Sequence, residues 1–247
     1  MTAERTTARR GGPGSTRRFL RDLAVIVVVA LLASFLIRTF LVRSFFIPSA
    51  SMEPTLLGEP GHHDRILVDE LVPRLVPIRR GDVVVFTDPG GWLGGEQTAS
   101  ATPSTPVAEA ADALLSLVGL STRDSDDHLV KRVIGLPGDH VACCDPLGRV
   151  TVDGAPLDEP YTRLPAGTRL ESRVPFDVVV RPGDLWVMGD NRWDSADSRY
   201  HQGSAEHGGV PTRDVVGRAS VVSWPVDRWR WIDDYPATFA GVPSSSR

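Results

Sequence analysis

A long apolar segment near the start of the chain constrains its fold more than any other feature. Residues 23–37 contain no charged side chain, and after Arg38 the apolar run resumes as far as residue 42. A helix needs roughly 20 residues to cross a bilayer, so residues 23–42 are long enough if Arg38 extends to the far interface. We therefore expect one N-terminal transmembrane helix over residues 23–42, after a basic tail over residues 1–22.

The charges on either side of this segment predict its orientation. Six arginines precede it, whereas only Arg38 and Arg43 lie at its far end. Because positively charged flanks tend to stay in the cytoplasm, we expect a cytoplasmic tail and an extracytoplasmic chain beyond residue 43, in a single-pass protein of the cytoplasmic membrane. A cleavable export signal is the alternative, since residues 16–20 loosely match a twin-arginine signal. The length of the apolar run and its interruption by Arg38 favour an uncleaved anchor.

The pattern after the anchor predicts a mostly β extracytoplasmic domain over residues 43–235. Short apolar runs are separated by Gly, Pro and Asp, which is typical of strands joined by turns. Asp153-Gly154 is a hairpin signal, and residues from about 143 to 180 are expected to form a smaller β subdomain. The expected strands are 66–68, 82–86, 129–134, 149–152, 176–180, 185–188 and 219–224.

Two segments depart from this rhythm. Residues 88–127 contain a Ser/Thr/Pro-rich stretch and then helix-like spacing over residues 107–120, which indicates an inserted surface loop with a short helix. Residues 236–247 are expected to be a disordered tail. We expect no second membrane span.

Charge and cysteine content exclude some function classes. A net charge of -4 gives no case for a nucleic-acid partner. The only cysteines, Cys143 and Cys144, are adjacent and lack the spacing of a metal site, so no metal is expected. Disulfide geometry usually disfavours a bond between neighbours, which leaves a vicinal disulfide and two small side chains on a strand as alternatives.

Lys131 is the only lysine among 27 basic residues. Arginine serves in ion pairs and on solvated surfaces, but its high pKa prevents it from acting as a neutral base. Lys131 lies inside the apolar run 129–134, where burial would lower the pKa of its amine. It is therefore a candidate general base that replaces the usual histidine. The alternative is a structural ion pair with an acid such as Asp197.

Two further segments are candidates for the rest of a site. Ser49 and Ser51 follow the membrane segment closely, and prolines on both sides restrict their backbone. They suit a nucleophile and an oxyanion donor, although a plain juxtamembrane linker is the alternative.

Residues 188–200 are dense in Asp, Asn, Arg and Ser, which are costly to bury unless they bond to one another. This run predicts a polar network that shapes a site, or alternatively a solvated loop.

Four motifs, in this order after the apolar segment, resemble those of bacterial type I signal peptidases. They are Ser-x-Ser-Met-x-Pro-Thr-Leu at 49–56, Arg-Gly-Asp-Val-Val at 80–84, Lys-Arg-Val-Ile-Gly-Leu-Pro-Gly-Asp at 131–139 and Gly-Asp-Asn-Arg-x-x-Ser-x-Asp-Ser-Arg at 189–199. The resemblance covers roughly residues 20–232 without the insertion. It implies the β catalytic fold that these enzymes share with self-cleaving repressors. Trp193 departs from the Asp that members often carry there.

The resemblance implies that Ser51 is the nucleophile and Lys131 the general base. The Ser49 hydroxyl and the Ser51 backbone N–H would form the oxyanion hole, and the chemistry needs no cofactor. The substrates would be the signal peptides of secreted preproteins, cut after a small-x-small (Ala-X-Ala) site. The lipid bilayer and, in proximity, the export translocon would be the other partners.

Other matched positions have supporting roles by the same resemblance. Ser195 would orient the Lys131 amine, and an Asp197–Arg199 ion pair would hold the polar loop. The small apolar substrate pockets would be lined by Phe45, Ile47, Leu56 and Val130.

Three alternative functions remain after this comparison of motifs. A self-cleaving Ser/Lys repressor would need a DNA-binding module where this chain has an apolar segment. A specialised peptidase would serve a pilus or a single secretion substrate. An inactive, membrane-tethered binding module is the third, and the retained serines and lysine argue against it.

Overall fold

The computed structural model describes residues 13–40, 42–59, 61–93 and 127–243. It divides the chain into an N-terminal helix and a unit that begins at Val42. Most of the insertion expected at 88–127 lies outside the described residues. So do residues 1–12 of the expected basic tail and the last four residues.

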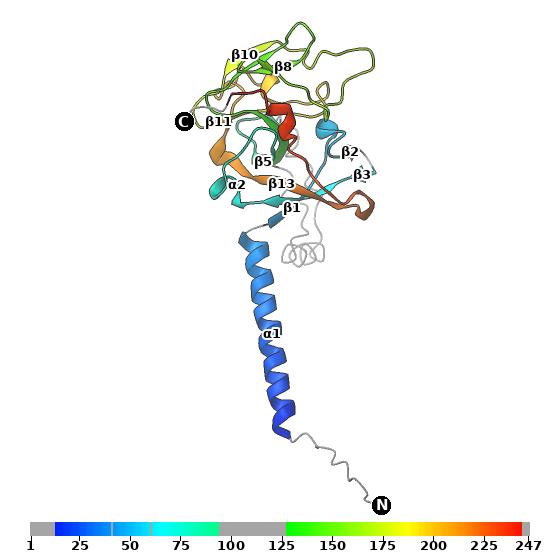
Figure 1. The fold of residues 1–247 in the computed structure, drawn as a ribbon, viewed down its shortest axis with the longest axis vertical. Helices are drawn as coiled ribbons and strands as arrows, with labels where there is room; N and C mark the ends of the chain where they lie inside the picture. Colours follow the sequence, from blue (N-terminus) through cyan, green and yellow to red (C-terminus); the bar gives the residue numbers. More distant parts are fainter. Residues whose placement is uncertain (1–12, 41, 60, 94–126, 244–247) are drawn as a thin grey trace, which may run out of the picture. The chain divides into compact units, whose positions relative to one another are not determined.

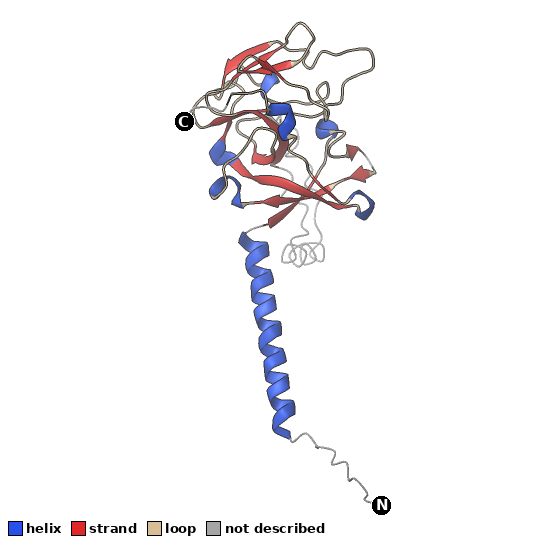
Figure 2. Cartoon of the chain, viewed as in Figure 1, coloured by secondary structure: helices blue, strands red, loops and turns tan. Residues whose placement is uncertain are grey.

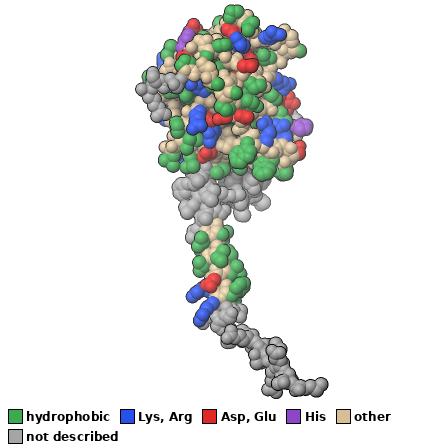
Figure 3. Space-filling model, in the orientation of Figure 1, with side chains coloured by type: hydrophobic (Ala, Val, Ile, Leu, Met, Phe, Trp, Pro, Cys, Tyr) green, Lys and Arg blue, Asp and Glu red, His purple; other side chains and the backbone are tan. Residues whose placement is uncertain are grey.

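Helix α1 spans Pro13–Phe40. Proline is tolerated in the first turn of a helix, and no further Pro or Gly follows Gly14 within α1. Many hydrophobic side chains of its described part are exposed, and Figure 3 shows some of them on one face. No helix among the described residues reaches the length and hydropathy of a membrane span. The transmembrane helix over residues 23–42 therefore stays a prediction.

The second unit is mostly β, as expected, and its main element is an eight-stranded antiparallel sheet (Figures 1 and 2). Seven strands follow one path and β14 pairs with β13 beside it. In path order they are β1 (Val42–Phe46), β4 (Arg65–Asp69), β13 (Val215–Trp224), β5 (Val83–Thr87), β6 (His128–Gly135), β11 (Asp184–Met188) and β12 (Val210–Pro211), with β14 at Arg230–Trp231. The central strands are rich in Val and are buried on both faces, which explains their near-continuous apolar runs.

A smaller antiparallel sheet is formed by the strands that lie between β6 and β11 in the chain. Its order is β10 (Phe176–Val179), β7 (His140–Cys143), β8 (Val150–Val152) and β9 (Ala155–Pro156). It starts three residues before the subdomain expected at about 143–180. The hairpin predicted at Asp153-Gly154 is confirmed, because Val152 pairs with Ala155 and both turn residues have positive φ.

Short elements complete the unit. β2 (Gly58–Glu59) pairs with β3 (His62–His63), and the helix α2 spans Leu71–Arg74. Single 3-10 turns occur at Ala50–Met52, Ser198–Tyr200, Thr212–Asp214, Val226–Arg228 and Pro236–Phe239.

The last of these turns corrects the expectation of a disordered tail from Pro236. Thr238 is buried, and its hydroxyl donates to the Asp158 carbonyl at 2.8 Å. Val242 packs into the apolar cluster beneath the smaller sheet. Burial of these side chains orders residues 236–243, although the composition of the segment suggested disorder.

Cys143 and Cys144 form a disulfide. Of the two alternatives left open by the sequence, the structure contains the vicinal bond.

Candidate active site

Ser51 lies on the 3-10 turn Ala50–Met52, after Ser49 in extended backbone. The Glu53 N–H closes the turn on the Ala50 carbonyl at 3.0 Å. Met52 is buried in an apolar cluster that also contains β-strand side chains, so the turn is anchored on one side. Its other side presents the Ser51 hydroxyl, 3.2 Å from the Ser49 hydroxyl.

Lys131 points from β6 to this hydroxyl. Its Nζ donates to Ser51 Oγ at 2.8 Å and to the Val130 carbonyl at 3.1 Å. The residue is 3% exposed. Burial lowers the pKa of the amine from 10.5 to about 8, against the opposing effect of the Asp197 charge. At neutral pH about a tenth of the amines is therefore unprotonated and able to accept a proton.

Lys131 makes no ion pair within 4 Å among the described residues, because Asp197 is bound to Arg199. The Arg199 guanidinium donates to both oxygens of this carboxylate, at 2.8 and 2.7 Å. Burial by itself raises the pKa of Asp197, but the Arg199 charge and hydrogen bonds bring it below the usual range. The Asp197–Arg199 pair expected from the motif is therefore present, and the structural pairing of Asp197 with Lys131 is not.

Ser195 lies in the same loop but does not bond to Lys131 in the described part of the chain. Its hydroxyl donates to Asp197 Oδ2 at 2.8 Å, and the Gly189 N–H donates to the same oxygen at 2.9 Å. The single proton of the Ser195 hydroxyl is therefore donated to a buried carboxylate, which forms a charge-assisted hydrogen bond. The role of Ser195 in orienting the amine stays a prediction.

Asn191 is a site residue that the sequence analysis did not single out. Its backbone N–H donates to the Ser51 carbonyl, and its side-chain amide donates to the Ala50 carbonyl, both at 3.1 Å. Its place in the polar run 188–200 was the only available signal.

A second missed contact ties the nucleophile segment to the strand of the lysine. Arg132, next to Lys131, donates to both oxygens of Asp190 at 2.9 and 2.8 Å. The Thr55 hydroxyl donates to Asp190 Oδ2 at 2.5 Å. Arg132 and Asp190 are both fully buried. This network links the segment after Ser51, strand β6 and the polar loop.

The polar loop is anchored on its other side by Arg192. The guanidinium donates to Glu159 at 2.6 and 2.7 Å and to Glu171 at 2.8 Å. Trp193, where the chain departs from the family pattern, donates through Nε1 to the Leu170 carbonyl. The Arg173 guanidinium lies 3.9 Å from the centroid of its ring. Trp193 thus binds the segment around residue 170.

The residues expected to line substrate pockets belong to one apolar cluster with Met52. Phe45, Ile47 and Leu56 are buried in it, and Val130 packs against it partly buried. Their position beside the Ser51 turn is compatible with a pocket, and that role stays a prediction. No group of three or more His, Cys, Asp or Glu among the described residues is arranged to hold a metal ion.

This fold and site define a serine peptidase built on antiparallel β-sheets. A family model described as "Signal peptidase, peptidase S26" matches residues 20–224, and the chain belongs to this family. A probable signal peptidase I of Mycobacterium leprae is 39% identical over 235 residues, which cover 86% of this chain and 79% of that protein. Signal peptidase I of Mycobacterium tuberculosis is also 39% identical, over 227 residues that cover 86% and 75%. A crystal structure of signal peptidase I from Enterococcus faecalis covers 58% of this chain and 97% of its own at 22% identity, with a TM-score of 0.37.

Proposed function

We propose that this peptidase removes signal peptides from exported preproteins with a Ser51–Lys131 dyad, while anchored in the cytoplasmic membrane by residues 23–42. The observation that carries the dyad is the 2.8 Å contact between Lys131 Nζ and Ser51 Oγ in a buried setting. Family membership supports the substrate class.

In the proposed reaction the neutral Lys131 amine accepts the proton of Ser51, whose oxygen attacks the scissile carbonyl. The Ser49 hydroxyl and the Ser51 N–H would stabilise the oxyanion, and loss of one such donor typically lowers turnover by ~10²–10³. The protonated amine then donates to the leaving nitrogen. A water deprotonated by Lys131 hydrolyses the acyl-enzyme, which restores both groups.

We propose cleavage after a small-x-small sequence. Phe45, Ile47 and Leu56 are buried in the apolar cluster that contains Met52 of the Ser51 turn, and Val130 packs against this cluster. A pocket in this cluster would accept alanine and exclude larger residues, since overpacking a dense apolar cluster costs free energy. The substrate would emerge from the membrane or the nearby translocon.

The test is cleavage of a preprotein with an Ala-X-Ala site by the detergent-solubilised enzyme. Ser51→Ala and Lys131→Arg should each abolish cleavage, because the first removes the nucleophile and the second keeps a charge that cannot be neutralised. Arg213→Lys, an exposed exchange of the same two residue types, should leave activity unchanged. Full activity of Lys131→Arg would reject the dyad, whereas no cleavage of several such preproteins by the unaltered enzyme would reject the substrate class.

The anchor needs its own test. The full-length protein should remain with membranes during alkaline carbonate extraction. Val27→Arg with Val29→Arg should release it, because each charge in the centre of a span costs about 2.5–3.5 kcal/mol. Release of the unaltered protein would reject the anchor and leave the proposed catalysis untouched.

A further inference from the structure

The structure contains a cavity of about 460 Å³ beside the vicinal disulfide, away from Ser51. It lies against the smaller sheet, where Asp177, Ala142 and Thr151 occupy neighbouring register positions across β10, β7 and β8. All three line the cavity, together with Cys143 and Cys144. None of its lining residues belongs to the site around Lys131.

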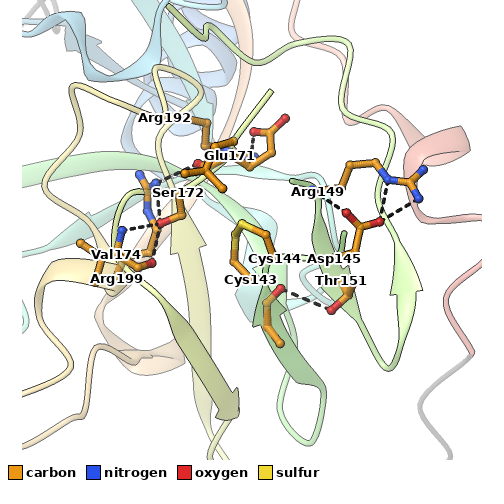
Figure 4. Close-up of a disulfide and its surroundings, with 12 residues drawn as sticks. Cys143, Cys144, Asp145, Arg149, Thr151, Glu171, Ser172, Val174, Arg192 and Arg199 are labelled. Carbon is orange, nitrogen blue, oxygen red and sulfur yellow. Dashed lines mark hydrogen bonds and ion pairs between the residues drawn. A yellow bond between two sulfur atoms is a disulfide. The ribbon is translucent and has the colours of Figure 1, made fainter. Parts of the chain in front are cut away.

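The two sulfur atoms have different surroundings. Cys143 is half-buried and packs against the apolar cluster beneath the smaller sheet, whereas Cys144 is exposed. Figure 4 shows the bond between them near the end of β7. An attacking thiol therefore has access to Cys144.

This disulfide contributes little to stability through the unfolded chain. A disulfide stabilises by closing a loop, and this one joins residues one position apart. The smaller sheet is instead held by strand pairing and by side chains such as Val141 and Phe176 in its core. Reduction should therefore leave the fold intact, which is a requirement for reversible chemistry at the two sulfurs.

The cavity also has a charge preference. Asp145 and Asp177 line it, and none of its described lining residues is basic. Arg149 forms an ion pair with Asp145 at 2.8 Å and balances that charge. Asp177 is 77% exposed and pairs with His140. Unlike arginine, a histidine carries a charge only when it is protonated, so neutral His140 leaves the Asp177 charge unbalanced. An approaching anion is thus disfavoured mainly by Asp177.

We propose that Cys143–Cys144 is a thiol–disulfide exchange site that selects neutral or cationic thiols over anionic ones. In the first step the thiolate of the incoming thiol bonds to Cys144 Sγ, and the Cys143–Cys144 bond breaks. Cys143 leaves as a thiolate and takes up a proton. A second thiol attacks the mixed disulfide, which leaves Cys144 as a thiol and the incoming reagent as its own disulfide. Two electrons pass from the reagent to the protein.

The experiment uses the full-length protein in detergent and three small thiols of different charge. Cysteamine, 2-mercaptoethanol and mercaptoacetate are applied at low salt at equal thiolate concentration. Acid-quenched intact-mass spectrometry follows the thiol adduct and the gain of two hydrogens. Each rate is divided by the rate of the same thiol with hydroxyethyl disulfide, which removes differences in intrinsic nucleophilicity.

Cysteamine should react about three- to tenfold faster than mercaptoacetate on this normalised scale, and salt should reduce the ratio. Asp177→Asn should lower the ratio by about two- to threefold. The matched control Asp227→Asn, an exposed carboxylate that does not line the cavity, should leave it unchanged. Near-ultraviolet circular dichroism after treatment checks that the protein is still folded.

Three results would overturn the proposal. One is free thiols in protein purified without reductant, detected by alkylation. The second is no exchange in the folded protein under conditions that reduce the denatured protein. The third is a normalised rate that does not depend on the charge of the thiol. None of these results bears on the proposed peptidase function, which is tested separately.

Discussion

Asn191 holds the backbone of Ser51 through a hydrogen bond of 3.1 Å from its N–H to the Ser51 carbonyl. Its side-chain amide binds the preceding carbonyl, that of Ala50, at the same distance. Two consecutive carbonyls of the turn are thus bound by one residue of the polar loop. The backbone of a residue fixes the direction of its Cα–Cβ bond. By holding the Ser51 backbone, this contact therefore positions the Ser51 hydroxyl relative to Lys131.

Asn191→Ala should therefore lower kcat about fivefold and change KM less than twofold. The substitution removes the amide donor to Ala50 while leaving the backbone bond, and a buried hydrogen bond contributes about 1 kcal/mol. Asn191→Asp should lower kcat at least as much, because its carboxylate cannot donate. Steady-state kinetics on a peptide substrate measure both effects. A change in KM alone would show that Asn191 binds substrate instead of positioning the nucleophile.

The pH profile should report the pKa of Lys131. The base is active when neutral, and its pKa is lowered to about 8, so kcat/KM should rise about tenfold per pH unit below pH 8 and level off above it. Measurements from pH 6 to pH 10 test this expectation. A plateau reached already at pH 6 would contradict the role of Lys131 as base.

Lys131 should also lower the free energy of unfolding at neutral pH. Its folded pKa of about 8 lies below the unfolded value of 10.5, because burial disfavours the charged amine. The free energy of unfolding therefore carries no penalty from Lys131 above pH 10.5. It decreases as the pH falls from 10.5 through 8, where the penalty becomes complete. Lys131→Met removes this penalty and should raise the free energy of unfolding by up to about 3 kcal/mol below pH 8. The gain should shrink towards pH 10.5. Denaturant unfolding at pH 7 and pH 10 provides the comparison, and an equal gain at both would contradict it.

The two carboxylates on Arg192 should respond differently to substitution. Burial raises the pKa of Glu171 to about 7, whereas the charge and hydrogen bonds of Arg192 outweigh burial and lower that of Glu159. Glu159→Gln should destabilise the fold by about 3–5 kcal/mol at pH 7, since it leaves Arg192 without its bidentate partner.

Glu171→Gln should have a smaller effect that depends on pH. The folded pKa lies above the unfolded value, so stability is fully present below pH 4.5 and decreases as the pH rises towards 7. The Gln variant should lack this decrease. Unfolding curves at pH 5 and pH 7.5 measure the difference, which would be absent if Glu171 ionised normally.

Gly189→Ala should abolish cleavage. A Cβ at this position would overlap the Ser195 hydroxyl and the Ser51 carbonyl oxygen. Because the carbonyl is backbone, the Ser51 turn itself would have to shift. Gly203→Ala, where the added Cβ meets nothing within 4 Å, is the matched control and should keep full activity. An active Gly189→Ala variant would show that the turn tolerates displacement.

Much of the fold could be predicted from local patterns. Strands such as β5 and β6 were evident from their Val-rich runs, and the β8–β9 hairpin from its turn residues. β7 and β12 were missed because they are short and depend on pairing with distant partners. The order at residues 236–243 was missed for a related reason, since it depends on burial against Asp158 and the smaller sheet.

The sequence by itself determined the types of side chain available for chemistry: one lysine among the basic residues, two serines between prolines, and a polar loop of complementary charges. Only the tertiary structure decided their relationships. Ser51 and Lys131 are 80 positions apart, and their contact, the burial that lowers the amine pKa, and the choice of Asp197 as partner for Ser195 all come from packing of distant segments. Hydrogen bonds depend on distances in space, and the local dielectric constant depends on burial. The order of residues along the chain specifies neither.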